Sequence, residues 1–80
     1  MKASLEISMY PLDQDYGNMI LDFIHRLREY ASIEVTTNRM STQVFGEYDE
    51  VMAAVTKEMK VSFEKDETIV MVMKVINLEV

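Results

Sequence analysis

The chain has 80 residues, which is the length of one domain (residues 1–80). It contains no Cys, so no disulfide can stabilise its small core. Association between copies is therefore a natural source of additional burial. The net charge is −6, and without a basic patch such a domain repels phosphate backbones, which argues against nucleic-acid binding. This acidic balance is compatible with a cationic ligand, although solubility alone explains most of the carboxylates.

The sequence carries no apparent targeting or membrane segment. No basic, apolar leader is visible at the N-terminus, and the longest apolar run is too short to span a bilayer. Together with the absence of Cys, these features favour a cytoplasmic protein that does not contact membranes.

Apolar and polar side chains alternate over residues 2–10, and this period of two predicts a strand with one buried face. Pro11 ends the strand because it lacks the N–H that a sheet needs. Asp13 or Asp15 is then expected to cap a helix. The buried face of the strand consists of Ala3, Leu5, Ile7 and Met9.

The apolar spacing changes to a helical period over residues 16–30, which predicts an amphipathic helix of about four turns. We expect Asp22, Arg26 and Glu29 to lie on its solvent side. The apolar face is formed by Tyr16, Met19, Ile20, Phe23, Ile24, Leu27 and Tyr30.

Two strands joined by a tight turn are expected next. Residues 33–37 alternate as a short strand, and the pair Asn38–Arg39 favours a hairpin turn, since Asn tolerates a positive φ. The third strand is predicted from Met40 to about Glu47. One of its faces carries Met40, Thr42, Val44 and Gly46.

A second helix is expected to begin at Tyr48, because Asp49 and Glu50 would lie in its first turn, near the positive end of the helix dipole. A charged turn at residues 64–67 would follow it. The last strand, from Thr68 to about Asn77, is apolar almost throughout, so we expect both of its faces to be buried. The predicted apolar stripe of the helix consists of Met52, Val55, Met59 and Phe63, with Val51 and Ala54 beside it.

The predicted order is β-α-β-β-α-β. Two right-handed crossovers that share a central hairpin give an α+β, ferredoxin-like sandwich, a four-stranded antiparallel sheet with two helices on one face. The opposite face would be left open, and it mixes apolar with polar groups. Such a surface is rarely left exposed to water in a monomer, so we expect a homo-oligomer; the alternative is a monomer with an adhesive face. The residues predicted on the open face are Ser8, Tyr10, Thr36, Gln43, Phe45 and half of the last strand.

The sequence contains no arrangement that specifies catalysis. A single His and no Cys exclude the usual zinc patterns, and the isolated glycines form no phosphate-binding loop. His25 lies in the middle of a predicted helix with no catalytic motif around it. An acylphosphatase-type enzyme on this fold would need a phosphate-cradling loop, whereas residues 11–15 are acidic.

Two groups of residues on the helix side of the sheet suggest a binding site. Thr37 and Thr42 would point the same way as the buried Val35 and Val44, where a hydroxyl must find a partner. That partner could be nearby backbone, the common outcome, or a ligand in a cavity. The many core-like Met residues could be core filler or the adaptable wall of a pocket. These are Met19, Met40, Met52, Met59, Met71 and Met73.

Two segments resemble the YkoF-like thiamine-binding family. Residues 8–12 (SMYPL) match its S-x-Y-P-[ML] segment, and residues 37–46 (TNRMSTQVFG) match its T-x-x-x-S-T-x-V-x-G hairpin. The helix between the segments and the helix start at residues 47–51 also fit. The resemblance implies an ACT-like, ferredoxin-like domain that is not an enzyme and that binds thiamine or its hydroxymethylpyrimidine moiety, without a further cofactor. It also implies that a single-domain member assembles into a dimer or tetramer.

The resemblance also implies roles for individual residues. The hydroxyls of Ser41, Thr42, Ser8 and Tyr10 would be the ligand-binding candidates, although Ser8 and Tyr10 could instead serve the subunit interface. The other implied contacts are Met19, Met40 and Met52 on the ring faces, Thr37 beside them, Glu47 or Asp49 at the thiazolium cation and Tyr48 at the mouth. The alternative is a structural or regulatory oligomerisation module that senses another metabolite.

Overall fold

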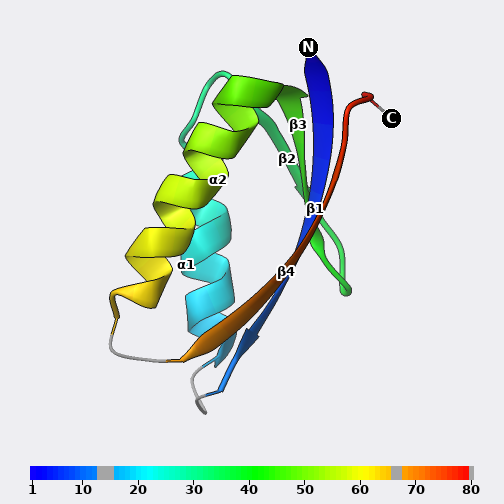
Figure 1. Ribbon diagram of the computed structural model, residues 1–80. Helices are drawn as coiled ribbons and strands as arrows, with labels where there is room; N and C mark the ends of the chain where they lie inside the picture. The colour runs from blue at the N-terminus through cyan, green and yellow to red at the C-terminus, as the bar shows by residue number, and fades with distance from the viewer. Residues whose placement is uncertain (13–15, 66–67, 80) are drawn as a thin grey trace.

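The structure is a computed structural model that describes residues 1–12, 16–65 and 68–79, and it has the predicted order of elements (Figure 1). The four strands form one antiparallel sheet in the order β2-β3-β1-β4, and both helices cover the same face of it. The ferredoxin-like sandwich is thus confirmed. The elements are β1 (Lys2–Pro11), α1 (Tyr16–Arg28), β2 (Glu34–Thr37), β3 (Thr42–Glu47), α2 (Tyr48–Phe63) and β4 (Ile69–Ile76).

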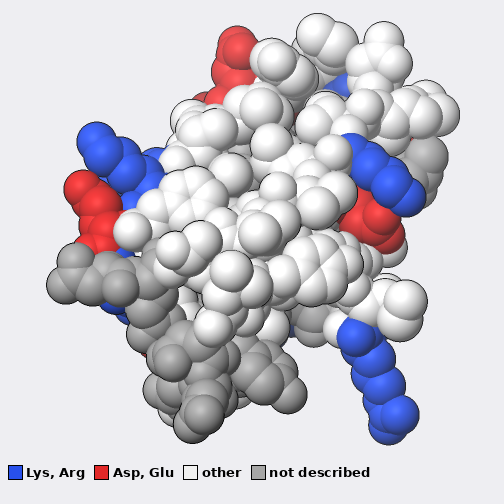
Figure 2. Space-filling model, turned by 60° about the horizontal axis from the view of Figure 1, so that its bottom comes forward, with Lys and Arg blue, Asp and Glu red and all other residues white. Residues whose placement is uncertain are grey.

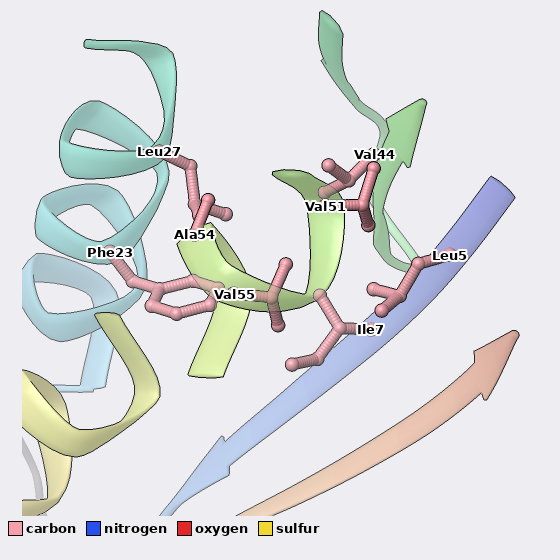
Figure 3. Packing of buried hydrophobic residues seen from close by; sticks show 8 residues of the cluster. All are labelled: Leu5, Ile7, Phe23, Leu27, Val44, Val51, Ala54 and Val55. Atoms are coloured by element: carbon pink, nitrogen blue, oxygen red, sulfur yellow. The ribbon is translucent and has the colours of Figure 1, made fainter. Parts of the chain in front are cut away.

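The core lies between the sheet and the two helices (Figure 3). Leu5 of β1 is directly opposite Val44 of β3, and Phe23 of α1 reaches in from the helix layer. Burying one such side chain stabilises the fold by about 1.5–3 kcal/mol, so this cluster holds the layers together. Its members are Leu5, Ile7, Phe23, Leu27, Val44, Val51, Ala54 and Val55.

The junction between β3 and α2 requires Gly46. Its φ of 157° is one that other residues rarely adopt, and a Cβ at this position would lie 3.2 Å from the carbonyl oxygen of Ser32, so glycine is strongly favoured here. The helix then begins at Tyr48, whose N–H donates to the carbonyl oxygen of Met1. Asp49 and Glu50 occupy its first turn as expected.

Three expectations about the helices and the hairpin are wrong. Arg26 does not face solvent but is half-buried against α2. The buried stripe of α2 is rotated from the predicted one, so that Phe63 is exposed, and its buried residues are Val51, Ala54, Val55, Glu58 and Ser62. The β2–β3 connection is a four-residue loop rather than a two-residue turn, which leaves Met40 outside β3 and 85% exposed.

The expectation that β4 is buried on both faces is also wrong for the single chain. The strand lies at the edge of the sheet, next to β1. Val70 and Val72 are exposed on the face without helices, where they lie opposite Tyr10 and Ser8 of β1. A continuous apolar run therefore identified the strand correctly but not its position in the sheet.

The expected cap at Asp13 or Asp15 and part of the charged turn (66–67) lie outside the described residues. In the part of the chain that the structure describes, no helix is long and apolar enough to cross a membrane.

Candidate functional site

A cavity of about 200 Å³ lies under the β2–β3 loop, between the helix side of β1 and α1. The end of the molecule where β1 ends and α1 begins is at the bottom of Figure 1 and comes forward in Figure 2. Figure 2 shows this end: uncharged side chains cover its centre, and charged ones lie toward the rim. The lining residues are Ile7, Met9, Tyr10, Ile20, Phe23, Ile24, Asn38, Arg39, Met40, Ser41 and Thr42.

The side chain of Asn38 holds the loop above the cavity in shape. Its Oδ1 accepts hydrogen bonds from the backbone N–H groups of Met40 (2.7 Å) and Ser41 (2.9 Å). The N–H of Asn38 in turn donates to the carbonyl oxygen of Ser41 at 3.1 Å. This Asx-type closure fixes the backbone at the point where β3 enters the sheet.

Thr42 is the buried polar group of the cavity, with only 6% of the residue exposed. It is the first residue of β3 and lies opposite Ile7 of β1, on the helix side of the sheet. Within the described ranges its hydroxyl has no hydrogen-bond partner. A buried hydroxyl without a partner costs about 1–3 kcal/mol, so the side chain is suited to a bound molecule that supplies the missing bond.

The neighbouring Ser41 points the other way. Successive strand residues alternate between faces, and the Oγ of Ser41 donates to Oε2 of Glu6 at 3.0 Å on the face without helices. Glu6 also lies 3.6 Å from the Nζ of Lys74. The two hydroxyls that the sequence places side by side are therefore separated, and only that of Thr42 faces the helix layer.

The walls of the cavity are apolar. Phe23 and Ile24 of α1 are buried beside it, and Met9 of β1 is half-buried. Tyr10 and Met40 are exposed and lie at its edge. Apolar walls with a few placed polar groups are typical of sites that bind small molecules.

A family model with the description "Thiamine-binding protein" matches residues 5–77, which is nearly the whole chain. The chain belongs to this family. Among curated proteins, no sequence matches it significantly.

Several solved structures share the fold of this chain. A protein from Streptococcus pneumoniae has a TM-score of 0.88 at 23% identity, with 100% of this chain and 90% of that chain covered. A hypothetical protein from Methanocaldococcus jannascii has a TM-score of 0.82 at 22% identity, over 98% and 81% of the two chains. A candidate thiamine biosynthesis or salvage protein from Thermotoga maritima has a TM-score of 0.81 at 18% identity, over 94% and 82%. At these identities the likeness shows the fold alone.

Of the residues expected in the site of this thiamine-binding family member, the structure brings Tyr10, Met40, Ser41 and Thr42 to the cavity. Ser8 is adjacent, with its Oγ 3.5 Å from the carbonyl oxygen of Met40.

The other expected residues lie elsewhere. Thr37 is exposed at the end of β2, Met19 is buried outside the cavity lining, and Met52 packs against the hydrophobic core. Glu47 and Tyr48 are at the opposite end of β3, five residues or about 17 Å from Thr42.

Glu47 interacts with groups near the start of the chain rather than with a ligand. Its carboxylate accepts a hydrogen bond from the N-terminal ammonium at 3.0 Å and lies 3.6 Å from Lys2. The hydrogen bond from the N-terminal ammonium and the charge of that group lower the pKa of the Glu47 carboxyl. Its expected role at a thiazolium cation therefore has no support from its position.

Sequence reasoning missed the contributions of Asn38 and Arg39 to the site, because both were assigned only to a turn. It also missed the α1 wall formed by Ile20, Phe23 and Ile24, which was assigned to the core. Asn38 and Arg39 could have been found from strand pairing. Because β1 and β3 are antiparallel, the β2–β3 loop must lie near the strand-end segment 8–12.

A larger hollow of about 310 Å³ lies on the face of the sheet without helices. Its polar groups already have partners: Glu6 interacts with Ser41 and Lys74, and the Oγ of Ser4 donates to the carbonyl oxygen of Leu78 at 2.6 Å. The cavity beneath the β2–β3 loop, with its unpartnered hydroxyl, is therefore the better candidate for a ligand.

Proposed function

We propose that this protein binds a small molecule in the cavity beneath the β2–β3 loop, and that the molecule is thiamine or its hydroxymethylpyrimidine moiety. The observation that carries the proposal is the buried hydroxyl of Thr42, which has no partner in the described part of the chain. An aminopyrimidine offers both ring nitrogens and an amino group, so it can complete the hydrogen bonding of a hydroxyl. The family to which the chain belongs supports this class of ligand.

The volume of the cavity favours the pyrimidine half. Sites for drug-sized ligands typically enclose about 300–1,000 Å³, whereas this cavity has about 200 Å³. One aromatic ring between Phe23, Ile24 and Met9 fits that space, and the remainder of a thiamine molecule would extend past Met40 into solvent or against another subunit.

The proposed role is binding rather than catalysis. The polar groups that line the cavity, in the described residues, are hydroxyls, one amide and one guanidinium. General acid–base catalysis near neutral pH needs a group such as a carboxylate or an imidazole within reach of the substrate, and the described lining contains neither.

Isothermal titration calorimetry with hydroxymethylpyrimidine, thiamine and a heterocycle without the amino group tests the proposal. We expect the two aminopyrimidines to bind and the control heterocycle not to bind. Thr42→Val should weaken binding at least about tenfold, the equivalent of one buried hydrogen bond. Thr36→Val is the matched control, because Thr36 is exposed on the opposite face of the sheet. Absence of heat at millimolar ligand would refute the proposal.

We further propose that the protein is a homo-oligomer whose subunits meet at the face of the sheet without helices. Three apolar side chains of β4, Val70, Val72 and Ile76, are about half exposed there, beside Tyr10 and Phe45. Exposed apolar side chains gathered on one face, here around the Glu6–Lys74 pair, are uncommon on a soluble monomer, and stacking a second sheet on this face would bury them.

Sedimentation velocity tests this arrangement. The native protein should sediment as a dimer or tetramer, and Val72→Lys should shift it toward the monomer because it buries a charge in the interface. Thr56→Lys, on the exposed side of α2, should leave the assembly unchanged. A monomeric native protein at micromolar concentration would contradict the proposal.

A further inference from the structure

The hydrogen-bonding groups at the mouth of the cavity are mainly donors. The Oδ1 of Asn38 already accepts two backbone hydrogen bonds, so its amide can offer a ligand only its N–H groups. The carbonyl oxygen of Met40 lies 3.5 Å from the Oγ of Ser8. Among the described lining residues, what remains for a ligand is the Asn38 amide N–H, the Arg39 guanidinium and the hydroxyl of Thr42.

Arg39 is the cation of this site. It lies in the β2–β3 loop, lines the cavity and is exposed, and it has no ion pair or hydrogen bond with any residue that the structure describes. Guanidinium groups bind planar, two-oxygen acceptors such as phosphate in a bidentate manner.

No carboxylate lines the cavity in the described ranges of the chain. The nearby Glu6 is on the other face of the sheet, where it interacts with Ser41 and Lys74. Among the described lining residues Arg39 is the only charged one, and it is positive in a protein with a net charge of −6. It disfavours a cationic group such as a thiazolium beside Arg39.

We infer that the ligand of this site is an aminopyrimidine that carries an anionic substituent, a phosphate monoester on its hydroxymethyl group, and that Arg39 binds the phosphate. This inference rests on the proposed function and deepens it. The apolar walls and Thr42 hold the ring, and the donors of the loop face the oxygens of the ester. Thiamine, whose second ring is a cation, is then the weaker ligand.

Calorimetry with hydroxymethylpyrimidine and with its monophosphate, on the native protein and on Arg39→Gln, tests the inference. The native protein should bind the monophosphate at least about tenfold more tightly than the neutral alcohol, since hydrogen bonds to a charged group are the stronger ones. Arg39→Gln should reduce this preference to less than about threefold, chiefly because it weakens the binding of the monophosphate.

Arg28→Gln is the matched control, because Arg28 is an exposed arginine at the end of α1 that does not line the cavity. It should keep the full preference. Equal affinities for the two compounds, or a preference that survives Arg39→Gln, would overturn the inference and leave the proposed function intact. Failure of both compounds to bind would overturn the proposed function together with the inference.

Discussion

Two buried polar side chains, Glu58 of α2 and Thr42 of β3, are each 6% exposed, but their surroundings differ completely. Glu58 lies between the helices, and both of its carboxylate oxygens have partners. Thr42 lies beside a cavity, and its hydroxyl has none among the described residues.

The carboxylate of Glu58 is the centre of a saturated network. Its Oε1 accepts a hydrogen bond from the Nε of Arg26 at 2.8 Å, and its Oε2 accepts one from the hydroxyl of Tyr30 at 2.6 Å. The Nη2 of Arg26 also donates to the carbonyl oxygen of Glu58 and, at 2.7 Å, to the Oγ of Ser62. A buried charge is tolerated only with such partners.

The difference between the two sites distinguishes a buried group that stabilises the fold from one that is suited to bind a ligand. A saturated buried group has little left to offer a ligand, and it orients the helices against each other. A buried group without partners destabilises the fold slightly, and a ligand that completes its hydrogen bonding gains that free energy on binding. Burial alone would not distinguish the two residues, whereas their hydrogen-bond partners do.

The largest expected effect comes from breaking the saturated site. Glu58→Ala leaves the half-buried guanidinium of Arg26 without its counter-ion and Tyr30 without its acceptor. Removal of one member of a buried pair typically costs about 3–5 kcal/mol, and the partial exposure of Arg26 places our expectation near the lower end, at about 3 kcal/mol. The free energy of unfolding from urea titrations measures it.

The control for this variant is Glu29→Ala, which removes an exposed carboxylate just after the end of α1, next to Tyr30 in the sequence. It should change stability by less than about 0.5 kcal/mol. A similar loss in both variants would mean that the network contributes no more than general surface charge.

A smaller effect is expected from pH at the same site. Burial raises the pKa of the Glu58 carboxyl, but hydrogen bonds from Tyr30 and Arg26 and the charge of Arg26 outweigh burial, so the pKa lies below its ordinary value of 4.5. The stability that this group contributes is therefore present above about pH 4.5 and is lost as the pH falls through the lowered value.

The hydroxyl of Tyr30 determines the pH above which the network loses its contribution to stability. The hydrogen bond to Glu58 raises the pKa of the Tyr30 hydroxyl above 10.0, so its contribution is present below pH 10.0 and is lost as the pH rises through the raised value. The difference in unfolding free energy between the native protein and Glu58→Gln should thus be largest at pH 5–9 and shrink on both sides. A difference that stays constant over pH 3–11 would contradict this explanation.

The fold could be predicted from the sequence because it depends on patterns that local residues carry. The alternation over residues 2–10 and the helical spacing over residues 16–30 specify elements, and their order leaves one common topology. The face of α2 was harder to assign, because its buried side includes the polar Glu58 and Ser62, which an apolar stripe cannot identify. Arg26 was placed in solvent for the same reason: its partner is 32 positions away.

The candidate site was predictable only in part. Thr42 was placed on the helix side by alternation, but the absence of a partner for its hydroxyl depends on the shape of the loop that Asn38 closes. The same alternation turns Ser41 to the other face, where Glu6 binds it. Glu47 and Tyr48, which the family resemblance placed at the ligand, lie at the far end of β3.

The smallest expected effect comes from the unpartnered site itself. Thr42→Val replaces a buried hydroxyl by a methyl group of nearly the same shape, so in the ligand-free protein it should leave the free energy of unfolding unchanged or raise it by up to about 1 kcal/mol. Ser62→Ala is the matched comparison, because Ser62 is also buried but accepts a hydrogen bond from Arg26. Its loss should cost about 1–2 kcal/mol. Urea titrations of both variants measure the contrast, and a Thr42→Val variant destabilised as much as Ser62→Ala would mean that the hydroxyl of Thr42 has a partner within the folded chain and is not held for a ligand.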